Sequence, residues 1–302
     1  MRGGRFGCVL YRMRTAITKE ITMNKTAKII MSTTLMASMA FSAFGCSTAE
    51  TTTADTTATE TTADVAETTE AAAETTEASE TAADLLEGKT VMTYAEYAAA
   101  PVDSEVTVET YIQAKQGWWE NEGVGNASFY TQDENGAYFL YNMPCTEDEY
   151  AKLTVGTKIK VNGFKSEWSG EVEITDAKFV IEEGNYVATA TDVTDKLASD
   201  ELISYQNLFV SFTDMTVEAS NDAGAAFLYS YDGSGSQGDD LYFKVSVNGQ
   251  TYTFTVESYL TGADTEVYKA VEGLKVGDKV DMEGFLYWYE GVNPHITKVT
   301  VK

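Results

Sequence analysis

A segment of 12 residues occurs twice in this chain, and this repeat restricts the possible folds more than any other feature. Residues 153–164 and 274–285 are identical at six of 12 positions, with an offset of 121. Each copy follows a β-rich run and precedes a glycine-containing turn. Two copies of one segment within the same order of elements indicate two related structural units. We therefore predict two modules, at 87–184 and 185–302.

The order of elements predicted for the first module is that of a small barrel. Strands are predicted at 106–115, 128–132, 137–143, 158–164 and 171–175, with a short helix from Thr146 to Lys152 between the third and the fourth. Thr93 and Glu96 have the spacing of a capping box, which predicts another short helix before the first strand. Three strands, a helix and two further strands are the elements of an OB-fold, in its order.

The second module repeats this order with insertions. Strands are predicted at 208–217, 225–231, 241–247, 251–256, 280–289 and 295–301, and helices at 199–205 and 265–274. The predicted fold class is therefore all-β: two tandem OB-fold-like five-stranded barrels with short helices, after a signal peptide and a disordered tether.

These motifs carry a family resemblance. The run Phe129-Tyr-Thr-Gln-Asp133 with Gly136, and two Leu-x-Val-Gly-x-Lys segments each followed by Gly-Phe, resemble the tandem OB-fold modules of bacterial surface lipoproteins. The resemblance covers most of residues 90–302. It implies the OB-fold for both modules. Related modules include nucleic-acid binders and appendages of secreted nucleases, so the resemblance alone does not assign a function.

The region before the modules resembles the export signal of a lipoprotein. A basic start, an apolar stretch and small residues precede Cys46, which predicts cleavage after Gly45 and a lipid on the Cys46 thiol. The signal peptide is predicted at 23–45, beginning at Met23, so that 1–22 is an upstream extension annotated in error. A generic secretory peptide and an uncleaved anchor remain as alternatives. The prediction places the protein outside the cytoplasm, lipid-anchored to the cell membrane at the cell surface or the periplasmic face.

Between the predicted signal and the modules lies a tract of low complexity. Residues 47–86 are almost entirely Thr, Ala, Glu, Asp and Ser, with no aromatic residue, lysine or arginine. Such a tract cannot bury enough apolar surface to offset the entropy of the chain. We predict that 46–86 form a lipidated, acidic and disordered tether.

The charge of the exported part bears on its partners. After Cys46 the chain contains 14 lysines and no arginine, and acidic residues far outnumber these lysines. Binding to a phosphate backbone uses clustered positive charge and favours arginine. The charge therefore argues against nucleic acid as a partner, although a single-stranded nucleic-acid-binding OB-fold protein stays the first alternative. Nothing in the sequence indicates an oligomer.

No motif for catalysis or for a cofactor stands out. His295 is the sole histidine, which excludes triads and metal sites built from several histidines, and Cys145 is the one cysteine of the modules. We predict a protein that is not an enzyme and has no cofactor. Acidic residues are abundant, so a carboxylate-based hydrolase remains a second alternative. A loop containing Asp232, Asp239 and Asp240 matches a calcium loop in part, but a solvated turn is the preferred interpretation, and no metal is predicted.

Aromatic residues are the remaining candidates for a binding site. Those near the predicted loops and hairpins are Trp118, Trp119, Tyr130, Tyr138, Tyr141, Trp168, Tyr287, Trp288 and Tyr289. Their rings would suit the flat faces of a ligand; the alternative is that they fill the barrels. The sequence thus predicts a membrane-anchored extracytoplasmic binding lipoprotein, non-catalytic, that recognises a glycan or protein ligand through aromatic OB-fold surfaces.

The lipidation prediction is tested by Cys46→Ala, which removes the only thiol at the predicted cleavage point. We expect the wild-type protein to carry lipid on an N-terminal Cys46, and the variant to be released or mislocalised. Mass spectrometry of the membrane fraction checks both. A mature protein that retains residues 1–45 would contradict the prediction.

Overall fold

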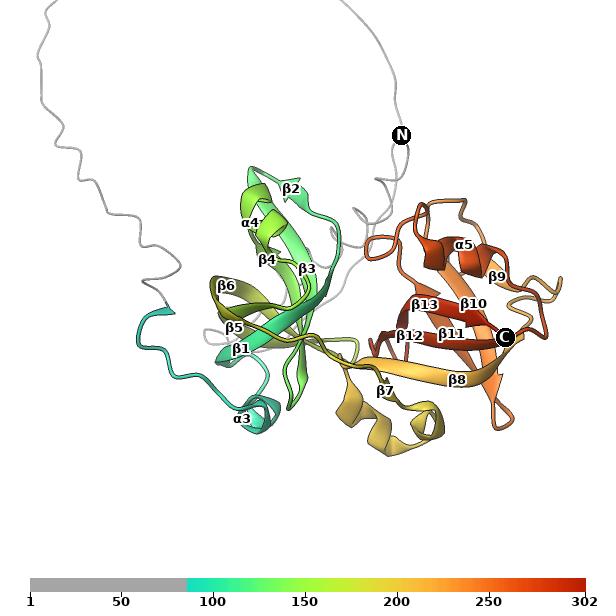
Figure 1. Ribbon diagram of the computed structural model, residues 1–302, viewed down its shortest axis with the longest axis horizontal. Coiled ribbons are helices and arrows are strands. Elements are labelled where there is room, and N and C mark those ends of the chain that lie inside the picture. The colour runs from blue at the N-terminus through green and yellow to red at the C-terminus, as the bar shows by residue number, and fades with distance from the viewer. Residues whose placement is uncertain (1–85) are drawn as a thin grey trace, which may run out of the picture. The chain divides into compact units, whose positions relative to one another are not determined.

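Both repeats fold as closed five-stranded barrels. The computed structural model describes residues 86–302, and the predicted signal peptide, Cys46 and all but the last residue of the predicted tether lie outside the described residues (Figure 1). The predicted fold class, all-β with two tandem OB-fold-like barrels and short helices, is confirmed over these residues. No helix among them is long and apolar enough to cross a membrane.

The first barrel follows the OB-fold strand order. Its strands are β1 (Glu105–Lys115), β3 (Val124–Gln132), β4 (Ala137–Pro144), β5 (Thr157–Trp168) and β6 (Glu171–Asn185). They run β1-β5-β6-β4-β3, and β3 pairs with β1 to close the barrel. The short strand β2 (Trp119–Asn121) extends β3. Strands β4 and β6 are parallel and the other neighbours antiparallel, which matches the OB-fold pairing.

Two capped helices accompany this barrel. They are α3 (Tyr94–Ala99), before β1, and α4 (Glu147–Lys152), between β4 and β5. The capping box predicted at Thr93 and Glu96 is confirmed: the Thr93 amide donates to Glu96 Oε2 at 2.7 Å, and the Glu96 amide donates to Thr93 Oγ1 at 3.3 Å. Each helix thereby satisfies N–H groups that have no partner within the helix.

The second barrel has the same connectivity. Its strands are β8 (Phe209–Glu218), β10 (Leu241–Val247), β11 (Gln250–Val256), β12 (Lys279–Phe285) and β13 (His295–Val301), with α5 (Glu266–Glu272) between β11 and β12. Strand β10 pairs with β8 to close the ring, and β11 and β13 are parallel. Shorter elements are β7 (Thr191–Asp192), η1 (Thr194–Lys196), η2 (Asp200–Tyr205) and β9 (Phe227–Tyr229).

Some element boundaries differ from the prediction. The predicted strand 225–231 contains only the three residues of β9, and the predicted helix 199–205 is a 3₁₀-helix. The predicted strand 280–289 ends at Phe285, because the Tyr287 amide donates to the Phe285 carbonyl at 2.8 Å and turns the chain away from the sheet. The loop that follows, 286–294, becomes one wall of the site described below.

Each barrel has its own apolar core, and a third cluster joins the two. Tyr130 and Phe139, from the outer face of β3 and β4, pack against Phe285 at the end of β12. The rings of Tyr130 and Phe285 stack with centroids 4.3 Å apart, and the Tyr130 hydroxyl lies 2.9 Å from His295 Nδ1. We call this cluster the seam; Tyr141, Phe209 and Tyr287 pack around it.

The second of the two glycines shared by the repeats, the one before the shared phenylalanine, is required by close backbone contact. Gly163 and Gly284 occupy equivalent positions beside irregularities in the β5–β6 and β12–β13 pairings. A Cβ atom on Gly284 would lie 2.2 Å from the His295 carbonyl oxygen, and one on Gly163 would lie 2.7 Å from the Thr175 carbonyl oxygen. The backbone of the neighbouring strand leaves no room for a side chain at either position.

We therefore expect Gly284→Ala and Gly163→Ala each to lower the free energy of unfolding by about 2 kcal/mol, since a side chain would force the two strands apart. Gly117→Ala is the matched control, because a Cβ there meets only the Tyr259 carbonyl oxygen at 3.9 Å. It should change stability by less than about 0.5 kcal/mol. Chemical denaturation measures all three; equal effects at Gly117 and Gly284 would refute the close-contact explanation.

Candidate functional site

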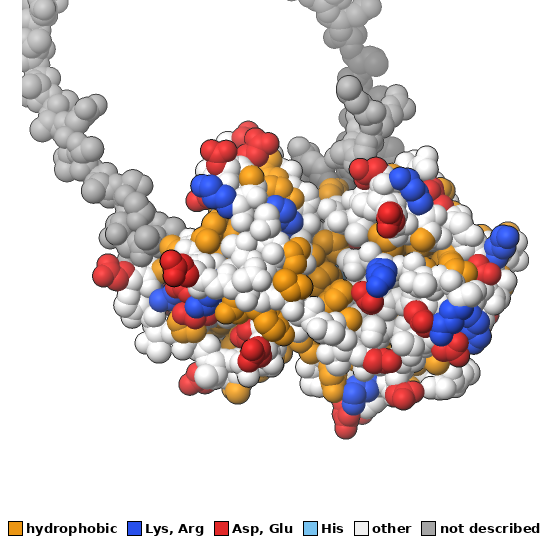
Figure 2. Space-filling view, viewed as in Figure 1, with side chains coloured by type: hydrophobic (Ala, Val, Ile, Leu, Met, Phe, Trp, Pro, Cys, Tyr) orange, Lys and Arg blue, Asp and Glu red, His pale blue; other side chains and the backbone are white. Residues whose placement is uncertain are grey.

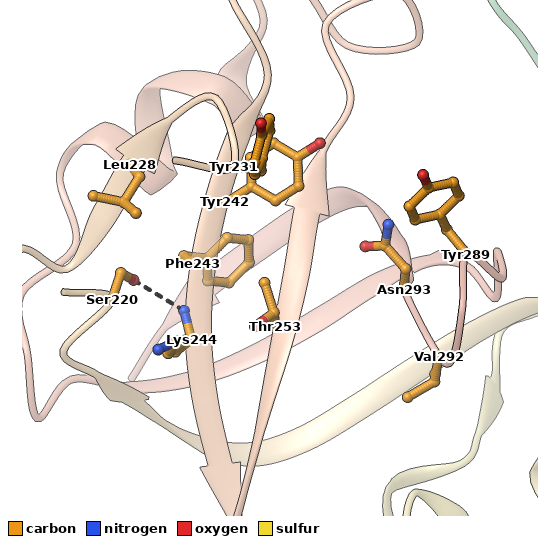
Figure 3. Close-up of a pocket in the computed structure, with 10 residues that line it drawn as sticks. All are labelled: Ser220, Leu228, Tyr231, Tyr242, Phe243, Lys244, Thr253, Tyr289, Val292 and Asn293. Carbon is orange, nitrogen blue, oxygen red and sulfur yellow. Dashed lines mark hydrogen bonds between the residues drawn. The ribbon is translucent and has the colours of Figure 1, made fainter. Parts of the chain in front are cut away.

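A cleft on the second barrel combines the OB-fold features that most often bind ligands. It lies over the outer face of β10 and β11, between the loop that contains β9 and the loop 286–294 (Figure 3). Its volume is about 340 Å³. The residues that line it are Ser220, Leu228, Tyr231, Tyr242, Phe243, Lys244, Thr253, Tyr289, Val292 and Asn293. The face of the second and third barrel strands, with the loops after the first and the fourth, is the usual OB-fold binding surface.

The floor of the cleft consists of side chains on the outer face of β10 and β11. Successive side chains of a strand point to opposite faces. On β10, Leu241, Phe243 and Val245 are buried in the barrel core, so Tyr242 and Lys244 stand on the outer face. Thr253 of β11 lies opposite Lys244 in the ladder. The floor therefore carries one ring, one cation and one hydroxyl.

The two loops supply the walls. Tyr231 is 76 % exposed and Tyr289 is 46 % exposed, and both border the same cleft as Tyr242. Figure 3 shows the rings of Tyr231 and Tyr242 close together near the middle of the lining, and the ring of Tyr289 to one side, beyond the Asn293 amide. Three tyrosine rings thus surround a space that is open to solvent.

Hydrogen bonds hold both loops in place. The Tyr268 hydroxyl, on α5, donates to the Asp239 carbonyl at 2.7 Å and accepts from the Gly238 amide at 2.9 Å. On the opposite wall, Asn293 Oδ1 accepts from the Thr255 hydroxyl at 2.7 Å. Contacts to α5 and β11 therefore hold both walls of the cleft.

The lining combines aromatic rings with hydrogen-bonding groups. Burial raises the pKa of Tyr242, and the negative charge of Asp240 raises it further, so its hydroxyl stays neutral and can donate a hydrogen bond. Lys244 contributes the one positive charge of the lining. None of the ten lining residues is an acid, a histidine or a cysteine. What the lining offers a ligand is ring faces and hydrogen-bonding groups.

Most of the aromatic residues predicted as ligand-binding candidates lie elsewhere. Tyr289 alone of the nine lines the cleft. Tyr138 is buried in the first barrel against Tyr97, with ring centroids 4.8 Å apart. Tyr130, Tyr141 and Tyr287 are in the seam, where the Tyr287 ring stacks on His295 at 4.3 Å.

The four tryptophans are all half-buried. Trp118 packs against the core of the first barrel, and its Nε1–H donates to the Cys145 carbonyl at 3.0 Å. Trp119 lies on β2 opposite Asn126. Trp168 ends β5, and Trp288 packs against the core of the second barrel. The structure therefore does not bring the predicted tryptophan pair to the cleft.

Sequence reasoning missed Tyr231 and Tyr242. A signal for Tyr242 was present, because strict alternation along 241–247 places its ring opposite the core-facing residues. Tyr231 had no comparable signal: it lies in a Gly/Ser/Asp-rich loop, and only the folded path of that loop brings it over β10.

The remaining candidates have structural surroundings. Asp232 Oδ1 accepts from the Ser234 amide, and Asp239 Oδ2 accepts from the Ser236 amide, as in ordinary turns. Asp240 Oδ1 accepts from both the amide and the hydroxyl of Ser258. Within residues 86–302, no three acidic, histidine or cysteine side chains are grouped so that they could hold a metal ion. Burial, with the nearby Glu149, raises the pKa of the Cys145 thiol to about 11.

Comparison with known proteins gives no family. No protein-family model and no curated protein matches the chain. Solved structures that match include a murine DNA-binding protein bound to double-stranded DNA, at 12 % identity and a TM-score of 0.31, over 65 % of this chain and 96 % of that one. Another is the Ifi202 HINa domain in complex with a 20-bp duplex, at 12 % identity and a TM-score of 0.29, over 66 % of this chain and 98 % of that one. A third is a replication protein A heterotrimer bound to single-stranded DNA, at 12 % identity and a TM-score of 0.30, over 68 % of this chain and 51 % of that one.

These matches correct one prediction. The charge of the sequence predicts that nucleic acid is not a partner. That exclusion is contradicted, because structures that match this chain are described in complex with DNA. The physical reason is that OB-folds also bind single strands by stacking bases on aromatic rings, which does not require clustered arginine.

Glu257 is a buried carboxyl group of the second barrel that contacts the first. Glu257 follows β11, and its Oε2 accepts a hydrogen bond from Gln116 Nε2 of the first barrel at 3.0 Å. Burial raises the pKa of Glu257 to about 8, and the charge of Asp240 adds to this effect. Burial lowers the pKa of His295 to about 3, so His295 is neutral in the folded protein at neutral pH.

We expect stability to fall as the pH rises from 6.5 to 8. In this range the folded protein keeps a proton on Glu257 that the unfolded chain, with an ordinary pKa of 4.5, has lost. Folding then requires proton uptake, and the free energy of unfolding falls by up to about 1.4 kcal/mol per pH unit until the pH passes 8. His295 does not contribute there, because it is neutral in both states above its ordinary pKa of 6.5. Glu257→Gln should flatten the profile measured by denaturation; identical slopes in the two proteins would contradict the prediction.

Proposed function

We propose that this protein binds a short single strand of nucleic acid in the cleft of its second barrel, without catalysing a reaction. The observation that carries the proposal is the meeting of Tyr231, Tyr242 and Tyr289 in one cleft on the usual OB-fold binding face. Bases that stack on aromatic side chains gain about 1–3 kcal/mol each, whatever their sequence. Lys244 lies on the cleft floor, where it can neutralise a phosphate.

A second candidate ligand is an oligosaccharide. Residues 86–302 contain 36 acidic residues against 14 lysines, and Figure 2 shows the lysines scattered among acidic side chains on the visible face. An uncharged sugar meets no repulsion from such a surface, and its rings can lie on tyrosine faces in the same way. The alternative of a carboxylate-based hydrolase finds no support in the cleft, whose lining contains no acidic residue.

The cellular location is proposed from the sequence alone. We infer from the run that ends at Cys46 that the two barrels are lipid-anchored outside the cytoplasm. The cleft would then meet ligands outside the cell membrane and not the cellular nucleic acid inside it.

The proposal is tested with a fluorescent oligothymidylate of about 12 nucleotides, a length within the range of OB-fold binding sites. Fluorescence anisotropy should show binding, and Tyr231→Ala and Tyr289→Ala should each weaken it about tenfold through lost stacking. Tyr259→Ala is the matched control, since Tyr259 is similarly exposed but does not line the cleft. It should leave the affinity within about twofold.

The dependence on salt separates stacking from phosphate binding. One lysine in the cleft predicts a slope of log affinity against log salt of about −0.7, the value for one neutralised phosphate of a single strand. A slope steeper than about −3 would show a basic surface that the cleft does not have. Binding of soluble oligosaccharides with no binding of the oligothymidylate would favour the second candidate, and binding of neither would refute the proposed function.

A further inference from the structure

The loop that forms one wall of the cleft rests on the first barrel. Loop 286–294 contributes Tyr289, Val292 and Asn293 to the lining. The Glu290 amide, in this loop, donates to the Ser169 carbonyl at 2.7 Å. Ser169 belongs to the turn that joins β5 and β6 of the first barrel. The corresponding loops of the two barrels, each between the fourth and fifth strands, are therefore in direct contact.

Glu171 is the centre of this contact. Its side chain is fully buried, and its Oε2 accepts a hydrogen bond from the Trp288 amide at 2.9 Å. Gln206 Nε2, from the second barrel, donates to the same oxygen at 3.2 Å and to the Gly170 carbonyl at 2.8 Å. One carboxylate oxygen thus binds two donors that belong to the second barrel.

Packing supports the same contact. A Cβ atom on Gly170 would lie 2.7 Å from Trp288 Cδ1, so the indole ring sits directly against the turn. Asn207 Nδ2 donates to the Val172 carbonyl at 3.0 Å, and the Asn207 amide donates to the Leu286 carbonyl at 2.9 Å. The contacts of the β5–β6 turn, the Trp288 indole and these amides together hold residues 286–290 in place. This segment includes Tyr289, whose ring is exposed.

We propose that Glu171 is a positioning residue for the cleft: the first barrel holds loop 286–294 so that Tyr289 faces the ligand. The effect of Glu171 on binding rests on the proposed function. The contact by which the first barrel holds loop 286–294, which we call the brace, rests on the hydrogen bonds alone. A preformed wall lowers the entropy that a ligand would otherwise have to remove from the loop. The first barrel would then contribute to affinity without touching the ligand.

The central variant is Glu171→Ala, which leaves the Trp288 amide without its acceptor. Hydrogen exchange should become faster at the amides of Trp288 and Glu290, and the affinity for the oligothymidylate should fall about tenfold. Glu171→Gln should restore both within about threefold, because its amide oxygen can accept from the same two donors. Rescue by this uncharged side chain separates positioning from a role of the charge.

Gln132→Ala is the matched control for general loosening of the barrels. Gln132 Oε1 accepts from the Phe209 amide at 2.8 Å, which is also a bond between the barrels but does not involve the loop. This variant should leave exchange at Trp288 and Glu290 unchanged. If Gln132→Ala and Glu171→Ala accelerate these amides equally, the brace is not local and the proposal is wrong.

The outcomes distinguish the brace from the proposed function. Unchanged exchange at Trp288 and Glu290 in Glu171→Ala would overturn the brace. Faster exchange with unchanged affinity would overturn the positioning role. If the wild-type protein binds neither the oligothymidylate nor a soluble oligosaccharide, the proposed function fails, and the exchange data alone decide whether the first barrel braces the loop.

Discussion

The stack of Tyr130 on Phe285 is the contact on which the arrangement of the two barrels depends. The two rings are nearly parallel, at 11°, and the Tyr130 hydroxyl is hydrogen-bonded to His295 of the second barrel. Tyr130 and His295 are buried in the seam, where an unpaired hydroxyl or ring nitrogen would be costly. Each group supplies the partner that the other needs. Because this hydrogen bond joins a residue of each barrel, it fixes the orientation of the barrels more specifically than apolar contact alone would.

The seam also gives the two barrels different roles. Tyr130, Phe139 and Tyr141 stand on the outer face of β3 and β4, which is the face where an OB-fold usually holds its ligand. In the first barrel this face is covered by the second barrel. The equivalent face of the second barrel, over β10 and β11, is left open as the cleft. Of the two repeated units, one thus leaves this face open as the cleft, and the other uses it as an interface between the barrels.

Local patterns in the sequence predicted the architecture, but they do not determine which aromatic residues are exposed. Three patterns are set by residues that are close together in the sequence: the 12-residue segment found at 153–164 and 274–285, the strand alternation and the Thr93–Glu96 cap. All three are found in the fold. Whether an outward ring is exposed depends on what covers it, which is a long-range property. Tyr130 and Tyr242 each lie on the outer face of the second strand of their own barrel. The seam buries Tyr130, whereas Tyr242 lines the cleft. No local pattern distinguishes these two tyrosines.

The charge distribution limits the length of a charged ligand more than it limits binding itself. A nucleotide that contacts a tyrosine ring gains about 1–3 kcal/mol, whereas one beyond the cleft gains no stacking. Outside the cleft it meets a surface where acidic residues outnumber lysines, 36 to 14. Screening reduces that repulsion beyond about 8 Å at physiological salt, so it acts mainly on phosphates held close to the surface. If the proposed function holds, the cleft suits a short strand or a strand end. An uncharged oligosaccharide is not repelled in this way, so its length is not limited by the charge. The dependence of affinity on ligand length therefore distinguishes a nucleic acid from an oligosaccharide.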